Sequence, residues 1–498
     1  MAAHLIEKLL AYGVTYLFLK EEDIIYVRNS LLFKLKVDAP DEKGLDFPSI
    51  KNLDVPDTLI SELEVYIKKH LHLENFECEQ LIEDIMADLT PLPSTINQMF
   101  WDKYKTSKED AVKFLYNLNV KANYVQKTKI AQNIKWVSKD GLEVSINLSR
   151  PEKDNKEIQK EAKIKSFNYP KCVICLENVG YFGRPNHSIR RTIRVVDLKL
   201  NDENWFLQYS PFGYYDEHLI VITNEHKPME VNRKNTEALF AFLDLFPFYF
   251  IGANSDLPIT GGSILSHEHF QGGRYTFPLM KAKDVFSLSL KGYEEIKTTY
   301  LDFYNSSFKL SSSNKVKLID LAMKINEAWL SFNDLEGEII SATNGQRHSS
   351  LTMIGRKQKD VYELFIILRN NRTNETHPDG IFHAHKKYHH IKREGIGLIE
   401  AMGLFILPPR LKRQSLLIEK IIEEDLKKEQ YLKLDPELVL FETMINDLRE
   451  SKENLSLRIK ENISDVCKNI LLNTSVFKKD ENGHKVLERF IKHLEKTL

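Results

Sequence analysis

The sequence predicts an α+β protein with helical regions at both ends. Near the start and near the end, apolar residues recur every three or four positions, as in amphipathic helices. In the middle, short apolar runs and alternating segments are typical of strands. On this basis we divide the chain into four regions: a helical region at 1–130, two mixed domains at 131–280 and 281–410, and a helical region at 411–498.

The first region, residues 1–130, is predicted to be helical because of its apolar spacing. Two sets of residues show this spacing: Leu5, Ile6, Leu9 and Leu10, and then Ile60, Leu63 and Ile67. The chain start is not typical of a signal peptide, since Glu7 and Lys8 interrupt its apolar run.

The second region contains the clearest strand patterns. Leu142, Val144, Ile146 and Leu148 alternate on one face. Further strands are predicted at 218–223 and 248–251, with a helix between them at 232–245.

The third and fourth regions continue the mixed pattern and then return to helix. A helix is expected at 315–330, a strand at 361–369 and another strand at 381–385. The fourth region carries a single apolar stripe on a charged helix: Leu417, Ile418, Ile421, Ile422 and Leu426.

Composition excludes several function classes. The 498 residues include 70 Lys and Arg against 71 Asp and Glu, so a net charge of -1 provides no basic field to recruit nucleic acid or an acidic membrane. The most apolar stretch, 238–252, is too short to span a bilayer and contains Asp244 and Pro247. With only four cysteines, the chain has no disulfide framework, which favours a reducing cytoplasm.

The segment GGSILSHEHFQGG, residues 261–273, is the main candidate for a catalytic site. In a strand, alternation would place His267, His269 and Gln271 on one face, and three buried polar side chains are costly without partners. Gly261 and Gly262 would let the backbone approach a ligand and hold phosphate oxygens with its N–H groups.

This pattern suits nucleophilic attack on phosphorus. A neutral imidazole is a competent nucleophile near neutral pH, and the Gln271 amide or the Ser263 hydroxyl can donate to the phosphoryl oxygens. Losing one such donor costs about 2.7–4 kcal/mol of transition-state stabilisation. The alternative is that the two histidines and the glutamine simply form hydrogen bonds inside a polar core.

Cys172 and Cys175 have the spacing of a metal-binding knuckle. A redox disulfide is the main alternative, although the thioredoxin-like context is missing. The second alternative is that Cys172 and Cys175 are two unrelated buried thiols.

The motif resembles the active-site strand of galactose-1-phosphate uridylyltransferases, in the histidine-triad superfamily, and its longer form resembles their second, divergent class. Three further stretches are similar: INLSRPEKD at 146–154, YPKCVICLEN at 169–178 and GIGLIEAMGL at 395–404. The resemblance covers nearly the whole chain. It implies two antiparallel histidine-triad-like half-barrels between the helical ends.

The resemblance also implies roles for individual residues. His269 would take the uridylyl group, and Gln271 would steady the phosphoryl oxygens. The remaining implied residues are Arg150 and Asn254 near the nucleotide and its phosphates, Glu400 at the hexose, and the zinc ligands Cys172, Cys175, His226 and His267. A second metal at His383 and His385, with His377 as a third ligand, is the less favoured interpretation, and a polar strand lining the sugar site is the alternative.

The function implied is ping-pong transfer of a uridylyl group from UDP-glucose to galactose 1-phosphate. A histidine-triad hydrolase or phosphorylase is one alternative, although such enzymes carry a third histidine where this chain has Gln271. A non-catalytic nucleotide-binding protein is the second. The better-known class of the family is dimeric, so a homodimer is an option.

Overall fold

The computed structural model describes residues 2–149, 168–262, 264–450 and 453–498, and the chain divides into two compact units. The first unit comprises Met1–Gln132, Lys153–Gly213 and Glu217–His226. The second comprises Asn133–Glu152, Tyr214–Asp216 and Lys227–Leu498. The candidates Arg150 and Ser263 lie outside the described residues. The division into four regions made from the sequence stays a prediction.

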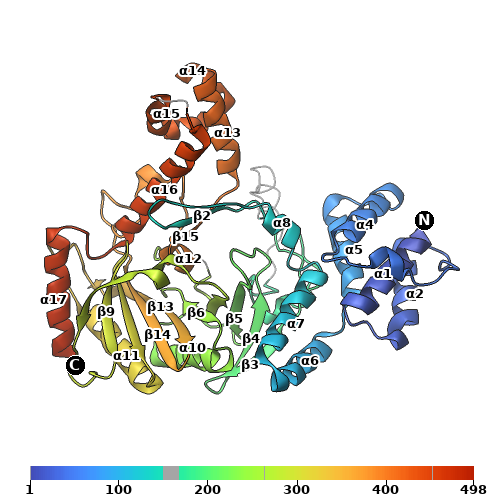
Figure 1. Ribbon diagram of the computed structural model, residues 1–498, viewed down its shortest axis with the longest axis horizontal. Helices are drawn as coiled ribbons and strands as arrows, with labels where there is room; N and C mark the ends of the chain where they lie inside the picture. Colours follow the sequence, from blue (N-terminus) through green and yellow to red (C-terminus); the bar gives the residue numbers. More distant parts are fainter. Residues whose placement is uncertain (1, 150–167, 263, 451–452) are drawn as a thin grey trace. The chain divides into compact units, whose positions relative to one another are not determined.

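The first unit begins with a set of helices (blue in Figure 1) and ends with three strands. The helices are α1 (Ala2–Tyr16), α2 (Ile24–Leu35), α3 (Phe47–Ile50), α4 (Asp57–His70), α5 (Asn75–Asp88), α6 (Pro93–Thr106), α7 (Lys108–Lys121) and α8 (Lys127–Ala131). Strands β3 (Val196–Leu200), β4 (Glu203–Tyr209) and β5 (Leu219–Thr223) pair antiparallel in that order. The α1 residues predicted from their spacing, Leu5, Ile6, Leu9 and Leu10, are all buried.

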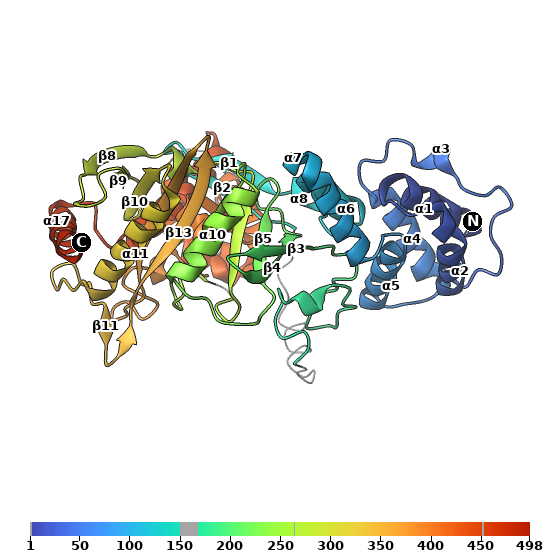
Figure 2. The same ribbon diagram turned by 90° about the horizontal axis from the view of Figure 1, so that it is seen from below.

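The second unit contributes seven consecutive strands of a sheet, in the order β7-β6-β13-β14-β10-β9-β8. These strands are β6 (Phe250–Ala253), β7 (His269–Gly273), β8 (Lys283–Leu288), β9 (Lys297–Asp302), β10 (Ser307–Ser312), β13 (Ser349–Gln358) and β14 (Val361–Asn370). All neighbours in it pair antiparallel. Helices α10 (Arg233–Leu245) and α11 (Lys315–Ser331) pack on this sheet, as Figure 2 shows.

Smaller elements complete the second unit. Strands β1 (Ile134–Val137), β2 (Glu143–Ile146) and β15 (Leu404–Leu407) form a separate sheet, in which β2 and β15 run parallel. A two-stranded hairpin joins β11 (Ala342–Thr343) and β12 (Gln346–Arg347). The later helices are α12 (Leu398–Ala401), α13 (Arg410–Glu423), α14 (Lys428–Leu434), α15 (Glu442–Arg449), α16 (Leu455–Thr474) and α17 (Glu481–Thr497).

The C-terminal helices share their core with the sheets of the second unit. Ile418, Ile421 and Ile422 of the predicted stripe are buried in a cluster that also contains residues of β2, β15 and α12. The α17 helix packs on α11, where the ring of Phe490 lies 5.6 Å from that of Trp329. The predicted α+β class with helical ends is therefore confirmed. Within the described residues, no helix combines the length and apolarity needed to cross a membrane.

Two local predictions are wrong. Residues 381–385 form turns rather than a strand, because Gly380 adopts a φ of +118° and the Ile381 N–H bonds the carbonyl of Arg372. In the histidine motif, β7 begins only at His269, so His267 precedes the strand. The residue between them, Glu268, donates its N–H to the Lys227 carbonyl at 2.7 Å instead of joining the ladder.

Candidate active site and metal centre

His269 is the first residue of β7 and is 4% exposed. Its Nδ1 lies 2.8 Å from the carbonyl oxygen of His267. Because a carbonyl oxygen only accepts, Nδ1 must carry the proton, which leaves the lone pair on Nε2. Burial lowers the pKa of this imidazole to about 4, so the ring is neutral near pH 7. A fixed tautomer with an unprotonated Nε2 is what a histidine nucleophile requires.

Gln271 lies two residues further along β7 and is half-buried. Since side chains alternate along a strand, Gln271 shares its face with His269. The strand is held in register by β6, where Gly252 pairs with Gln271 and Ile251 with Gly272. The amide of Gln271 is therefore placed on the same side as the imidazole.

Glu268 directly precedes β7 and anchors the motif. Its Oε2 accepts hydrogen bonds from Asn235 Nδ2 at 2.8 Å and from the Glu230 N–H at 3.1 Å, next to the start of α10. Burial raises the pKa of this carboxyl to about 8. These hydrogen bonds give Glu268 a structural role beside His269.

Asn254, Gly261 and Glu400 come together around the segment that leads into α12. The Asn254 Oδ1, directly after β6, accepts the N–H of Leu398 at 2.8 Å. Gly261 has a φ of +101°, and a Cβ on it would lie only 1.9 Å from the Ile396 carbonyl oxygen. Glu400 lies in α12, is 8% exposed and accepts a hydrogen bond from Lys392. Three residues implied separately by the resemblance therefore form one cluster.

The neighbouring Gly262 has a different environment. A Cβ on it would meet the end of the Leu265 side chain at 2.3 Å. Its contact is with the histidine motif itself, whereas that of Gly261 is with the backbone before α12. That these glycines hold phosphate oxygens stays a prediction.

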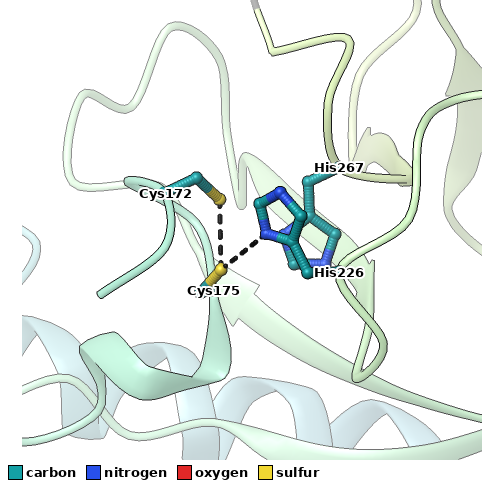
Figure 3. Close-up of side chains that lie close together, drawn as sticks. All are labelled: Cys172, Cys175, His226 and His267. Carbon is teal, nitrogen blue, oxygen red and sulfur yellow. Dashed lines mark hydrogen bonds between the residues drawn. The ribbon is translucent and has the colours of Figure 1, made fainter. Parts of the chain in front are cut away.

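Cys172, Cys175, His226 and His267 are gathered as the resemblance implied (Figure 3). Their ligand atoms all lie within 4.8 Å of one another. Cys175 Sγ is 3.3 Å from Cys172 Sγ and 3.1 Å from His226 Nδ1. None of the four cysteines, all of which the structure describes, forms a disulfide. Two sulfur and two imidazole donors make a group that fits a tetrahedral metal ion.

A hydrogen-bond clamp that sequence reasoning missed holds the knuckle. The Asn178 Nδ2 donates to the carbonyl oxygens of Cys172 and Cys175, each at 2.8 Å. Its Oδ1 accepts from His187 Nε2 at 2.7 Å, and both side chains are buried. In the sequence, only its position three residues after Cys175 pointed to a role for Asn178 at this site.

The second histidine cluster, His377, His383 and His385, is not arranged as a set of metal ligands. The rings of His377 and His385 stack with centroids 3.9 Å apart, and His385 Nε2 lies 3.1 Å from the Ile381 carbonyl oxygen. Both ring nitrogens of His383 are buried without a partner in the described chain. Burial lowers the pKa of His383 to about 4. The described residues place only the Cys172 group within metal-ligand distances.

Comparison with known proteins identifies the class. The family described as "Galactose-1-phosphate uridyl transferase, N-terminal domain" matches residues 61–228, from within α4 to past β5. A buried neutral histidine beside a glutamine on one strand fits that class of nucleotidyltransferase.

The relatives extend the match to the whole chain. Galactose-1-phosphate uridylyltransferase from Clostridium acetobutylicum is 39% identical over 99% of this chain and 99% of its own. An enzyme of the same name from Fusobacterium nucleatum is 37% identical over 98% of each chain. The chain belongs to the galactose-1-phosphate uridylyltransferase family, which confirms the resemblance seen in its motifs. The crystal structure of yeast Ap4A phosphorylase Apa2 aligns with 64% of this chain and 92% of its own at 13% identity and a TM-score of 0.33, too weak to support a conclusion.

Proposed function

We propose that the chain moves a uridylyl group from UDP-glucose to galactose 1-phosphate through a uridylyl-His269 intermediate. In the first half-reaction Nε2 of His269 attacks the α-phosphorus, and glucose 1-phosphate leaves. In the second, the phosphate of galactose 1-phosphate attacks the same phosphorus and frees the histidine, giving UDP-galactose. The observation that carries this proposal is the Nδ1 bond to the His267 carbonyl, which leaves Nε2 unprotonated.

Gln271 has the second role in this mechanism. Its amide N–H would donate to a phosphoryl oxygen as negative charge develops there. Removing such a donor costs about 2.7–4 kcal/mol, or roughly 100- to 1000-fold in rate. The histidine-triad hydrolases and phosphorylases carry a third histidine at this position, so Gln271 favours transfer over hydrolysis.

The test is to incubate the protein with UDP-glucose labelled in the uridine and to look for an acid-labile, base-stable protein adduct. Wild type should label stoichiometrically, and His269→Gly should not. His493→Ala is the control, because His493 lies on α17 and bonds Ser331. No adduct in wild type, or equal labelling of His269→Gly, would refute the mechanism.

We also propose that the Cys172, Cys175, His226 and His267 group holds a structural zinc ion. Its two sulfur and two imidazole donors suit zinc, and four protein ligands leave no open position for a substrate. When bound, the ion would fix the segment that precedes His269 rather than act on the substrate.

Metal analysis tests the zinc proposal. Cys172→Ser should lose the metal, whereas Cys78→Ser, which removes a buried cysteine from α5, should keep it. Equal zinc content in the two variants would contradict the assignment.

We place the enzyme in the cytoplasm, with sugar phosphates rather than nucleic acid as its ligands. Four cysteines without a disulfide among them suit a reducing compartment. A homodimer is an option that the resemblance leaves open, and light scattering on the purified protein decides it.

A further inference from the structure

Lys392 is a buried lysine whose environment is dominated by Glu400. It is 7% exposed and precedes α12 by six residues. Its Nζ donates to Glu400 Oε1 at 3.0 Å and to the carbonyl oxygen of Ile406 in β15 at 3.0 Å. Burial alone would lower the pKa of this ammonium, but the nearby carboxylates of Glu400 and Glu394 outweigh it and the net shift is upward. The lysine therefore stays charged.

The two oxygens of Glu400 have different surroundings. Oε1 is occupied by Lys392. Oε2 accepts no hydrogen bond among the described residues, and it would lie 3.4 Å from a Cβ placed on Gly397. The same point is 3.7 Å from Asn254 Oδ1 and 3.0 Å from the Gly261 carbonyl oxygen. The second oxygen thus lies toward the loop that leads to the histidine motif.

A buried ion pair contributes little net stability, because desolvation offsets its Coulomb attraction. Replacing a buried ion pair with a hydrophobic pair is often neutral or stabilising, so stability alone does not explain this one. A carboxylate held by one oxygen with the other unpartnered is a directed acceptor, suited to a hydroxyl group. Burial restricts the rotation of the Glu400 carboxylate, and the hydrogen bond from Lys392 fixes its orientation.

We propose that Lys392 is a positioning residue that orients Glu400 to accept one hydroxyl of the hexose. This inference rests on the proposed function and on the contact with the hexose that the resemblance implies for Glu400. Lys392 itself touches no substrate and acts by tying α12 to β15 through the Ile406 carbonyl. The consequence is selectivity for sugar phosphates that carry a hydroxyl at the recognised carbon.

The experiment compares kcat/KM for galactose 1-phosphate with that for its 2-, 3-, 4- and 6-deoxy analogues. Loss of a hydrogen bond to a charged acceptor corresponds to about a 10- to 100-fold change. Wild type should therefore reject one of the analogues by that factor. Glu400→Gln should lose most of this selectivity, and Lys392→Met should lose it to a similar extent. A role confined to folding would lower the rates with all the sugars together.

The double variant tests whether Lys392 works through Glu400. Lys392→Met/Glu400→Gln should show the same selectivity as Glu400→Gln alone, because Lys392 has no further effect once the Glu400 carboxylate is gone. It also removes both buried charges, so it provides a folded comparison if Lys392→Met is unstable. Lys392→Arg keeps the charge but moves it, and it should reduce selectivity severalfold. Lys468→Met, which removes an exposed ion pair with Asp140, is the control.

The outcomes separate the two ideas. If Glu400→Gln keeps wild-type selectivity against every analogue, the proposed role of Glu400 fails, and the inference about Lys392 fails with it. If Glu400→Gln loses selectivity while Lys392→Met or Lys392→Arg keeps it, only the inference about Lys392 is overturned. Losses that multiply in the double variant would also overturn it.

Discussion

Substituting Gly261 with alanine should disturb the active site through the backbone before α12. Two costs apply. A φ of +101° is strained for alanine by about 1–3 kcal/mol. The new Cβ would also lie 1.9 Å from the Ile396 carbonyl oxygen, and such overpacking costs about 1–3 kcal/mol more. Since this contact is with backbone, neither group can rotate away.

Gly345→Ala is the matched control. Gly345 has a φ of +79°, and a Cβ there would meet nothing within 4 Å. It therefore carries the conformational cost without the clash. The difference between the two variants isolates the contact with Ile396.

The assay combines stability with exchange and activity. A change of 1 kcal/mol shifts Tm by about 2–4 °C in a domain of 150–250 residues and by less in a larger one, so Gly261→Ala should melt a few degrees below Gly345→Ala. Hydrogen exchange should also speed up at the Leu398 amide, which bonds Asn254. Activity should fall in Gly261→Ala alone. Equal Tm, exchange and activity in the two variants would refute this account.

Three further predictions concern buried polar contacts. Asn178→Ala should weaken zinc binding about 10- to 100-fold in a chelator competition, because the carbonyl oxygens of Cys172 and Cys175 lose the hydrogen bonds from its amide. Unchanged affinity would show that these hydrogen bonds are dispensable. Burial raises the pKa of Glu83 to about 7, so the stability of the wild type should fall as the pH rises from about 4.5 to 7. Glu83→Gln should remove this dependence of Tm on pH. The same dependence in both proteins would show that Glu83 is not its cause. Glu268→Gln keeps an acceptor for Asn235 and should retain activity, whereas Glu268→Ala should lower Tm and activity together; a fully active alanine variant would show that the anchor is unnecessary.

Local patterns were enough to place His269 and Gln271 on one face of a strand, but not to predict the contacts that support them. His269 and Gln271 share a face because of the two-residue period of a strand, which the sequence displays directly. The position of His267 depended on a bond between its neighbour Glu268 and Lys227, 41 residues away, which no local pattern contains. The strand predicted at 381–385 failed for a similar reason, since the positive φ of Gly380 turns the chain there.

The residues that orient the candidate site are brought to it by tertiary contacts. Lys392 and Glu400 are eight residues apart, with an irregular segment between them, so neither helical nor strand spacing connects them. Asn178 follows the knuckle closely, but its role depends on His187 folding back to it. The sequence shows the reactive groups through their types and spacing, whereas a residue that orients them can be far along the chain and of any polar type.

The histidine motif combines both kinds of residue in three consecutive positions. The His267 carbonyl fixes the tautomer of His269, and its imidazole is a candidate metal ligand. Glu268 binds Asn235 of α10 and so holds the backbone next to that carbonyl. His269 then begins the strand with Nε2 unprotonated. Each of these interactions positions the next, so the imidazole proposed as the nucleophile is held by its own neighbours before any substrate arrives.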